Sequence, residues 1–319
     1  MKDGFNREID YLRISVTDLC NLRCTYCMPA AGVAKKEHSE IISIDFIEEV
    51  VRTCADLGFR KVRLTGGEPL VRRGITEICR RISNVPGIDE LCMTTNGILL
   101  KEYSAKIKEA GVDRLNISLD TFDDDKYRKL SRCTEDEHPV RTVFEGIEAA
   151  RKAGFTNIKI NTVLMGGIND DEIGKFVELT KDEDIQVRFI ELMPIGEAKE
   201  WDESCFITNE TVLEKCPDLE PCGESGVAHV YKVPGYKGTV GLISPVSSHF
   251  CSYCNRLRLT ADGRLKACLH SGKETYIMGL SGDELKEAIV KEIANKPKGY
   301  DLSVVNPSSA KRNMNRIGG

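Results

Sequence analysis

The chain has 319 residues, 41% of them hydrophobic, which is enough to bury the core of one large domain or two smaller ones. Its 45 lysines and arginines are outnumbered by 50 aspartates and glutamates, which gives a formal net charge of −5. This acidic balance argues against a long nucleic acid as a partner, and no apolar run is long enough to cross a membrane.

The first ten residues, MKDGFNREID, are charged and have no apolar centre, so we expect no signal peptide. We therefore expect a cytoplasmic protein with reduced thiols, in which clustered cysteines are metal or redox ligands rather than disulfides. Three of the scattered cysteines, Cys54, Cys79 and Cys92, lie in apolar-periodic segments. We interpret these three as small buried hydrophobic side chains.

Short β-rich runs alternate with helical patterns through the first two-thirds of the chain. The runs lie at 11–17, 61–67, 90–97, 114–120, 158–165 and 185–193. Six such βα units predict an α/β fold with a parallel sheet and helical crossovers. The rhythm ends after Pro194, and a less regular unit rich in Gly and Pro follows. We therefore predict two domains, 1–196 and 197–319.

Three cysteines with C-x3-C-x2-C spacing, Cys20, Cys24 and Cys27, follow the first predicted strand. A 4Fe-4S cluster normally takes four thiolates, so a site with three leaves one iron open to bind a further ligand. A zinc ion would need a fourth ligand, and His38 is the candidate in the following loop. We favour the cluster over the zinc site.

With Tyr26 between its last two cysteines, this segment resembles the motif of the radical S-adenosylmethionine (radical SAM) superfamily. In that family the open iron binds the amino and carboxylate groups of SAM, and an electron from the cluster splits the sulfonium to methionine and a 5′-deoxyadenosyl radical. The resemblance implies a partial (β/α)6 TIM-like barrel that is open on one side. Periodicity alone does not decide whether the sheet closes.

Chemistry in parallel α/β sheets collects at the carboxyl ends of the strands. The second predicted strand ends in Gly66-Gly67-Glu68-Pro69, which resembles the family's GGEP motif, although such a sequence is also a common turn. The resemblance implies that the SAM site is lined by Tyr26, Gly67, Ser118 and Met193. It also places Thr94 at the substrate nucleotide.

Three apolar residues alternate with three polar residues in the first predicted strand, so the two sets point to opposite faces. The apolar set is Leu12, Ile14 and Val16, and the polar set is Arg13, Ser15 and Thr17. The apolar set must face the helices, which leaves the polar set facing the lumen. The same reasoning sends inward Lys61, Arg63, Thr65, Lys159 and Asn161 and, less cleanly, Arg188.

Burying several unpaired cations is strongly unfavourable, so we expect a small polyanion to occupy this lumen. The alternative is that some of these cations reach the rim or pair with Glu68 and Asp120.

A second set of three cysteines lies in the C-terminal unit. Cys251 and Cys254 form a C-x2-C pair, and Cys268 follows a hairpin-like RLRLTADGRLKA whose turn is Asp262-Gly263. His270 could complete a Cys3His zinc site, so spacing alone leaves zinc and iron–sulfur about equal.

Two features favour a second iron–sulfur cluster. The first motif already commits the protein to assembling such centres, and Arg256 and Arg258 stand on one face beside the second. Together with the C-terminal sequence MNRIGG, these motifs resemble the radical SAM family that cyclises GTP in molybdenum cofactor biosynthesis. The resemblance covers nearly the whole chain, but residues 131–139 and 198–230 match no motif, and nothing is transferred onto them.

In that family both clusters are 4Fe-4S, and the second holds the guanine of GTP while arginines hold the triphosphate. The resemblance implies as cluster ligands Cys20, Cys24, Cys27, Cys251, Cys254 and Cys268. It implies as nucleotide contacts Arg13, Arg63, Thr94, Lys159, Arg256, Leu257 and Arg258. It assigns to catalysis Arg13, Arg256, Arg258, Gly318 and Gly319, with the tail inserted into the active site. A frayed terminus is the ordinary alternative for that tail.

The implied reaction starts with cleavage of SAM. The adenosyl radical removes the 3′ hydrogen of the GTP ribose, the C3′ radical attacks C8 of guanine, and a reduction, for which the second cluster is a candidate source, gives 3′,8-cyclo-7,8-dihydro-GTP. The implied partners are GTP, an external electron donor and a downstream cyclic pyranopterin monophosphate synthase, with a homodimer as the candidate oligomeric state.

Two rival interpretations remain open at this point. One is another radical SAM enzyme with an auxiliary cluster, such as a peptide-modifying maturase, although those usually have a more cysteine-rich C-terminal region. The other is a non-enzymatic iron-sensing module, which would need neither a cationic lumen nor GGEP at a strand end.

Overall fold

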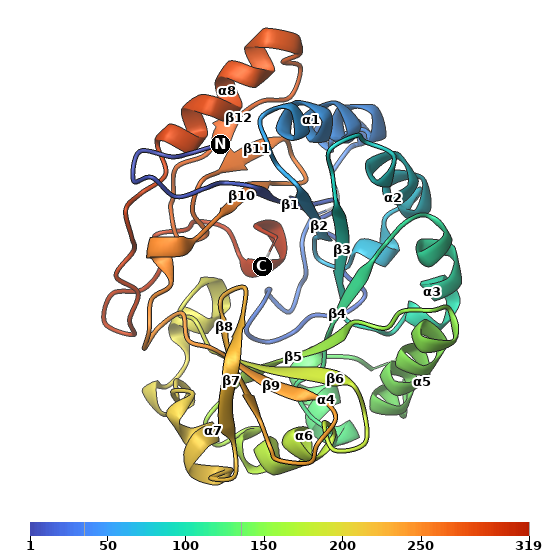
Figure 1. Ribbon diagram of the computed structural model, residues 1–319, viewed down its shortest axis with the longest axis vertical. Coiled ribbons are helices and arrows are strands. Elements are labelled where there is room, and N and C mark those ends of the chain that lie inside the picture. The colour runs from blue at the N-terminus through green and yellow to red at the C-terminus, as the bar shows by residue number, and fades with distance from the viewer. Residues whose placement is uncertain (35, 135, 319) are drawn as a thin grey trace.

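The structure is a computed structural model that describes residues 1–34, 36–134 and 136–318. Its first part is built from alternating strands and helices arranged as an arc around a central space (Figure 1). The strands are β1 (Tyr11–Ser15), β2 (Lys61–Thr65), β3 (Glu90–Thr95), β4 (Arg114–Ser118), β5 (Ile158–Leu164) and β6 (Ile185–Glu191). The helices are α1 (Ile44–Asp56), α2 (Ile75–Ser83), α3 (Leu100–Glu109), α4 (Asp124–Ser131), α5 (Pro139–Lys152) and α6 (Ile173–Glu178).

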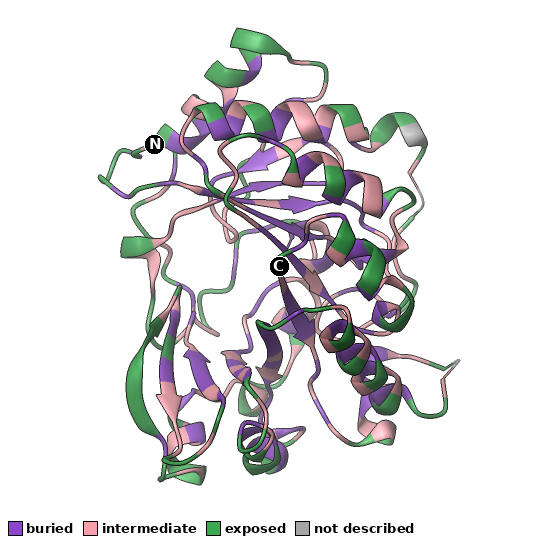
Figure 2. Cartoon of the chain, turned by 45° about the vertical axis from the view of Figure 1, so that its right-hand side comes forward, coloured by how far each residue is buried: buried purple, intermediate pink, exposed green. Residues whose placement is uncertain are grey.

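Strands β1 to β6 are parallel and lie in sequence order, which confirms the predicted βα architecture. Their outward side chains pack under the helices, whose outer faces are exposed in Figure 2. Leu12, Ile14 and Val16 all belong to this buried core, as the alternation in β1 predicted. Cys54 and Cys79 lie in the same core and Cys92 is also fully buried, so their interpretation as small hydrophobic side chains is confirmed.

The C-terminal part adds strands to both edges of this sheet. Its elements are α7 (Glu210–Lys215), β7 (Glu220–Ser225), β8 (Ala228–Lys232), β9 (Thr239–Ile243), β10 (Arg256–Leu259), β11 (Arg264–Lys266), β12 (Thr275–Tyr276) and α8 (Gly282–Ala294). Strand β9 pairs in parallel with β6, and β10 pairs in parallel with β1. The result is one twelve-stranded sheet in the order β12-β11-β10-β1-β2-β3-β4-β5-β6-β9-β8-β7.

This linear strand order agrees with an open, partial barrel rather than a closed one. Because the two parts share a sheet, the division at residues 196 and 197 describes the sequence more than the packing, and it stays a prediction. The predicted hairpin is present, since β10 and β11 pair antiparallel and Gly263 takes a positive φ of 71° in the turn. No helix among the described residues is long and apolar enough to cross a membrane.

The C-terminal end enters the central space of the arc (Figure 1). A short 3-10 helix at Met314–Arg316 precedes it. The tail is therefore an inserted segment rather than a frayed end, at least as far as Gly318.

Candidate functional site

The first three cysteines lie in the loop that follows β1, at the carboxyl end of the barrel. The backbone N–H groups of Cys27 and Met28 both donate to the carbonyl of Cys24, at 2.9 and 3.1 Å, which folds the loop into a tight turn. Burial raises the pKa of the Cys24 thiol, and the nearby thiols of Cys27 and Cys20 raise it further. Three thiols in one tight turn are a donor set suited to an iron–sulfur cluster, whose irons would hold them as thiolates despite the raised pKa.

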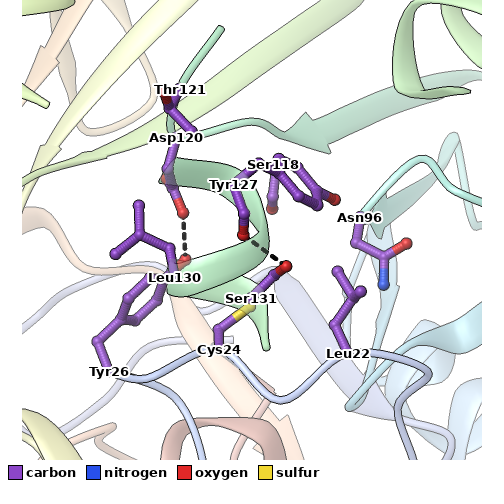
Figure 3. Close-up of a pocket in the computed structure, with 10 residues that line it drawn as sticks. All are labelled: Leu22, Cys24, Tyr26, Asn96, Ser118, Asp120, Thr121, Tyr127, Leu130 and Ser131. Carbon is purple, nitrogen blue, oxygen red and sulfur yellow. Dashed lines mark hydrogen bonds between the residues drawn. The ribbon is translucent and has the colours of Figure 1, made fainter. Parts of the chain in front are cut away.

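A pocket opens beside this loop (Figure 3). Ten residues line it: Leu22, Cys24, Tyr26, Asn96, Ser118, Asp120, Thr121, Tyr127, Leu130 and Ser131. Two of the four residues predicted for SAM, Tyr26 and Ser118, are among them. The other two, Gly67 and Met193, lie outside this lining, so the structure does not bring all four into one pocket wall.

Asp120 holds Tyr26 in place. The Tyr26 hydroxyl donates to one carboxylate oxygen of Asp120 at 2.7 Å (Figure 3). The backbone N–H of Val163 donates to the other carboxylate oxygen at 2.8 Å. Burial raises the pKa of Asp120 to about 6, so its carboxylate remains mostly charged at neutral pH. The two carboxylate oxygens of Asp120 thus accept hydrogen bonds from Tyr26 and Val163 rather than from the lumen cations.

Gly67 lies just after β2, and its backbone packs against the start of the loop that carries the first three cysteines. A Cβ at this position would lie 2.3 Å from the carbonyl oxygen of Leu19, and the Gly67 N–H donates to the carbonyl of Thr17 at 2.8 Å. Only glycine permits this approach. The next residue, Glu68, is buried and accepts from the N–H groups of Leu70 and Asn96. Burial raises the pKa of Glu68 to about 7.

Three arginines stand in one row across the lumen face of the sheet. The parallel register pairs Arg13 with Arg258 on one side and with Arg63 on the other. Side chains in register on neighbouring strands point to the same face, so this is one layer of three guanidiniums. Arg63 and Arg258 are each only 4% exposed. Burial and the neighbouring cations lower the pKa of Arg13 to about 9, which leaves it charged at neutral pH.

Two of these cations donate hydrogen bonds to neutral oxygens. Arg63 donates to the hydroxyls of Tyr11 and Thr94, and Arg13 donates to the carbonyl of Gly318 at 3.0 Å. Lys61, by contrast, forms an ion pair with Glu90. The alternative that Glu68 and Asp120 neutralise the set is wrong, since both carboxylates, which follow the carboxyl ends of β2 and β4, are engaged by backbone N–H groups and hydroxyls.

Several buried polar atoms in this region have no hydrogen-bond partner within the part of the chain that the structure describes. They are the Nε atoms of Arg256 and Arg258 and the Oδ1 atoms of Asn116 and Asn161. Orphaned donors and acceptors of this kind are costly unless a ligand satisfies them. The lumen therefore fits a small polyanion that also carries hydrogen-bonding groups.

Lys159 lies on β5, four strands along the sheet from Arg13 on β1. Its ammonium donates to Gln186 Oε1 at 2.8 Å and to Ser225 Oγ at 3.0 Å, and Arg188 donates to the same two side-chain oxygens. Gln186 and Ser225 were not predicted. Gln186 could have been found, because it precedes Arg188 by two residues on β6 and so shares its face. Ser225 lies in a stretch without any recognised motif.

Binding of a polyanion should be accompanied by uptake of a proton at Lys159. Burial, together with Arg188, Arg114, Lys61 and Arg63, lowers the pKa of Lys159 to about 7, and an anion would raise it again. The contribution of charged Lys159 to anion binding is complete below pH 7, and it is lost as the pH rises through the pKa that Lys159 has in the complex. Calorimetry at pH 8 in buffers of different ionisation enthalpy should show proton uptake with GTP, the nucleotide that the family resemblance implies. Lys159→Met should abolish most of it, and a wild-type protein without uptake would contradict this assignment.

The second three cysteines lie at the other end of the lumen. Cys254 comes two residues before β10, whose first residue pairs with the first residue of β1, and Cys268 follows β11, which runs back antiparallel. Burial raises the pKa of Cys254, but Lys296 and Arg256 outweigh it and lower that pKa to about 7. A thiolate is the form that binds iron, so this environment also fits a cluster.

His270 was the candidate fourth ligand of a zinc site. Its ring stacks on Tyr300 with 5.1 Å between centroids, and burial lowers its pKa to about 4. Within residues 1–34, 36–134 and 136–318, no group of three His, Cys, Asp or Glu side chains is placed to hold a single metal ion. Leu257, predicted as a nucleotide contact, has its side chain in the hydrophobic core, so any such contact would come from its backbone.

Ion pairs anchor the inserted tail. Arg312 pairs with Asp262 at 2.9 Å and with Glu274 at 2.7 Å, and Arg316 pairs with Asp18 at 3.2 Å. Gly318 then reaches the lumen with a positive φ of 68°. The prediction for Gly319 falls outside the described residues.

Both the sequence and the structure of this chain resemble those of known proteins. The radical SAM superfamily matches residues 14–180, and the family described as Molybdenum Cofactor Synthesis C matches residues 185–302. Proteins named GTP 3′,8-cyclase from Alkaliphilus oremlandii and Alkaliphilus metalliredigens are 48% and 46% identical, and each alignment covers 100% of both chains. The crystal structure of Streptococcus suis SuiB bound to S-adenosylmethionine is 15% identical with a TM-score of 0.60, covering 91% of this chain and 66% of that one, so it supports the fold alone.

Proposed function

The chain belongs to the radical SAM superfamily and, within it, to the GTP 3′,8-cyclase family, and from that membership we propose that it converts GTP to (8S)-3′,8-cyclo-7,8-dihydroguanosine 5′-triphosphate. This is the first step of molybdenum cofactor biosynthesis. The cofactors would be two 4Fe-4S clusters and S-adenosylmethionine.

The observation that carries the proposal is the order of groups along the barrel axis. One cysteine triad follows the carboxyl end of β1, the other flanks the amino end of β10, and the row of Arg13, Arg63 and Arg258 lies between them. A strand advances about 3.3 Å per residue, so the five residues of β1 span roughly 17 Å. A nucleoside triphosphate in this lumen would lie between the two triads and meet the buried guanidiniums on the way.

We assign the first cluster to Cys20, Cys24 and Cys27 and the second to Cys251, Cys254 and Cys268. Bound there, the clusters and S-adenosylmethionine supply the electron transfer and the radical that the reaction needs. The SAM site is assigned to Tyr26, Gly67, Ser118 and Met193. Tyr26 would be oriented for this role by its hydrogen bond to Asp120.

The protein's own contribution is placement of the nucleotide and exclusion of water. Arg13, Arg63, Arg256, Arg258 and Lys159 would neutralise the phosphates, for which a guanidinium's planar fork is suited. The backbone of Leu257 and the hydroxyl of Thr94 are the remaining proposed contacts. The tail that carries Gly318 and Gly319 would close the lumen next to Arg13.

An external electron donor, a cyclic pyranopterin monophosphate synthase that takes the product, a cytoplasmic location and a homodimeric state complete the proposal. All four follow from the family resemblance.

Iron content and product analysis test the proposed function. After anaerobic reconstitution the protein should hold about eight irons and eight sulfides per chain. With a reductant and SAM it should form 5′-deoxyadenosine, and with GTP added it should form the cyclised nucleotide. About four irons per chain, or equal turnover of ATP, would contradict the proposal, and modification of a peptide instead would support the rival maturase.

Arg256→Ala and Arg258→Ala should each weaken GTP binding by roughly 1.5–3 kcal/mol, because each removes a charge-assisted contact to the nucleotide. Iron content should stay at the wild-type level. Equilibrium binding of GTP to the reconstituted protein measures the effect, and Arg52→Ala on the exposed face of α1 is the matched control. Unchanged GTP affinity in both lumen variants would remove these arginines from the site.

A further inference from the structure

The first nine residues form a compact turn that the proposed reaction does not use. Lys2 and Glu8 form an isolated antiparallel bridge, and Ile9 N–H donates to the carbonyl of Met1 at 2.7 Å. Inside the turn, Asp3 accepts from the side chain and from the backbone N–H of Arg7. Two charged residues of this segment therefore form a buried ion pair, because Asp3 and Arg7 are only 8% and 7% exposed.

Arg7 extends from this turn to the second cysteine triad. One terminal nitrogen of its guanidinium donates to the carbonyl of Cys251 at 2.7 Å and to the carbonyl of Lys298 at 3.1 Å. The other donates to the carbonyl of Pro297 at 2.6 Å. A single side chain thus joins the backbone of one proposed cluster ligand to the segment that follows α8.

Lys296 binds the backbone next to the other two proposed ligands, Cys254 and Cys268. Its side chain is buried, and its ammonium donates to the carbonyl of Ala267 at 2.6 Å and to the carbonyl of Arg256 at 2.8 Å. Ala267 directly precedes Cys268, and Arg256 lies two residues after Cys254. Residues 296–298 are therefore the common point at which all three cysteine-bearing segments are held.

From this arrangement we propose that Arg7 and Lys296 are positioning residues of the second cluster, holding the Cys251, Cys254 and Cys268 segments at the spacing that the cluster requires. The inference rests on the proposed function in one respect, namely that these cysteines bind a 4Fe-4S cluster. It goes beyond that function because neither residue is one of the proposed nucleotide contacts, and Arg7 comes from the N-terminal turn.

Two physical arguments support a role beyond general stability. Burying a cation costs free energy, so buried cations usually pair with acidic groups. Arg7 and Lys296 instead donate several hydrogen bonds to backbone carbonyls in and around the loops that carry the thiols. Outer hydrogen bonds that orient metal ligands commonly change metal affinity by about 10–100-fold when removed. A positive charge beside a cluster also favours its reduced form, because reduction adds negative charge to the site.

The test uses the full chain after anaerobic reconstitution, with Lys296→Met, Lys296→Arg and Arg7→Lys. Lysine at position 7 can still pair with Asp3 but has no planar fork to reach three carbonyls. We expect Lys296→Met and Arg7→Lys to release about four of their eight irons to a chelator on the order of 10–100-fold faster than wild type, with 5′-deoxyadenosine formation retained. Arg60→Met is the matched control, because Arg60 also donates to a backbone carbonyl, that of Gly87, away from both triads.

Spectroscopy separates positioning from mere stability. In a Cys24→Ser background, which leaves only the second cluster, Lys296→Met should shift its reduction potential to more negative values and alter its electron paramagnetic resonance signal. Lys296→Arg should restore both in large part. Iron release at the wild-type rate with an unchanged signal would overturn the proposal, as would the loss of both clusters in Lys296→Met. A wild-type chain with only about four irons would instead refute the second cluster itself, and the proposed function with it.

Discussion

Replacement of Cys24 by serine is expected to abolish cleavage of S-adenosylmethionine. The thiol of Cys24 lines the pocket next to Tyr26 and Asp120, and its backbone carbonyl folds the cysteine loop. A serine hydroxyl is a poor ligand for iron, so the first cluster should be lost locally while the second survives. Iron should fall from about eight to about four per chain, and anaerobic 5′-deoxyadenosine formation should fall to background.

The control is Cys222→Ser, which replaces an exposed cysteine of β7 that belongs to neither triad. Both its iron content and its 5′-deoxyadenosine formation should match the wild type. Formation of 5′-deoxyadenosine at the wild-type level by Cys24→Ser would contradict the assignment of the first cluster.

Removal of Gly318 and Gly319 is expected to eliminate cyclisation of GTP while leaving both clusters and uncoupled cleavage of S-adenosylmethionine largely intact. Gly318 has a positive φ of 68°, and its carbonyl accepts from Arg13 Nε at 3.0 Å. The truncation removes this contact from the row of lumen arginines without touching a cysteine. Measuring 5′-deoxyadenosine and cyclised nucleotide in the same reaction tests it.

Gly318→Val gives the same test without shortening the chain. A Cβ at Gly318 would lie 2.8 Å from Thr65 Oγ1, and the positive φ is itself unfavourable for a β-branched residue. We expect this variant to resemble the truncation. Val305→Ala, at a site 88% exposed in the same C-terminal segment, should behave as wild type. A normal yield of cyclised product from the truncated protein would show that the tail has no part in the reaction.

Ion pairs fix the position of the short C-terminal tail. Arg312 reaches Asp262 in the β10–β11 turn, while Arg316 reaches Asp18, two residues before the first cluster ligand. Lys36 joins the two acceptors, at 2.8 Å from Asp18 and 3.2 Å from Asp262. The tail is thus tied to both cysteine-bearing regions, and these pairs are shielded enough from solvent to resist screening better than surface pairs.

Local patterns were sufficient for much of the fold and part of the site. Alternation within β1 sent Arg13 inward and Leu12 outward because a strand has a period of two residues, and the structure confirms both. The cysteine spacings identified two triads because the ligands of each lie close together in the chain or on one hairpin. Such features depend on a few neighbouring residues, which is why the sequence by itself determined them.

Tertiary structure alone decided which segments meet. The C-terminal strands join both edges of the barrel sheet, so Arg258 comes into register with Arg13, and Ser225 reaches Lys159 from a hairpin without a motif. Arg7 and Cys251 are 244 residues apart and yet share a hydrogen bond. Contacts across such separations depend on how the strands of the whole sheet are ordered and on which partners each buried charge requires, and no local period of the chain encodes either.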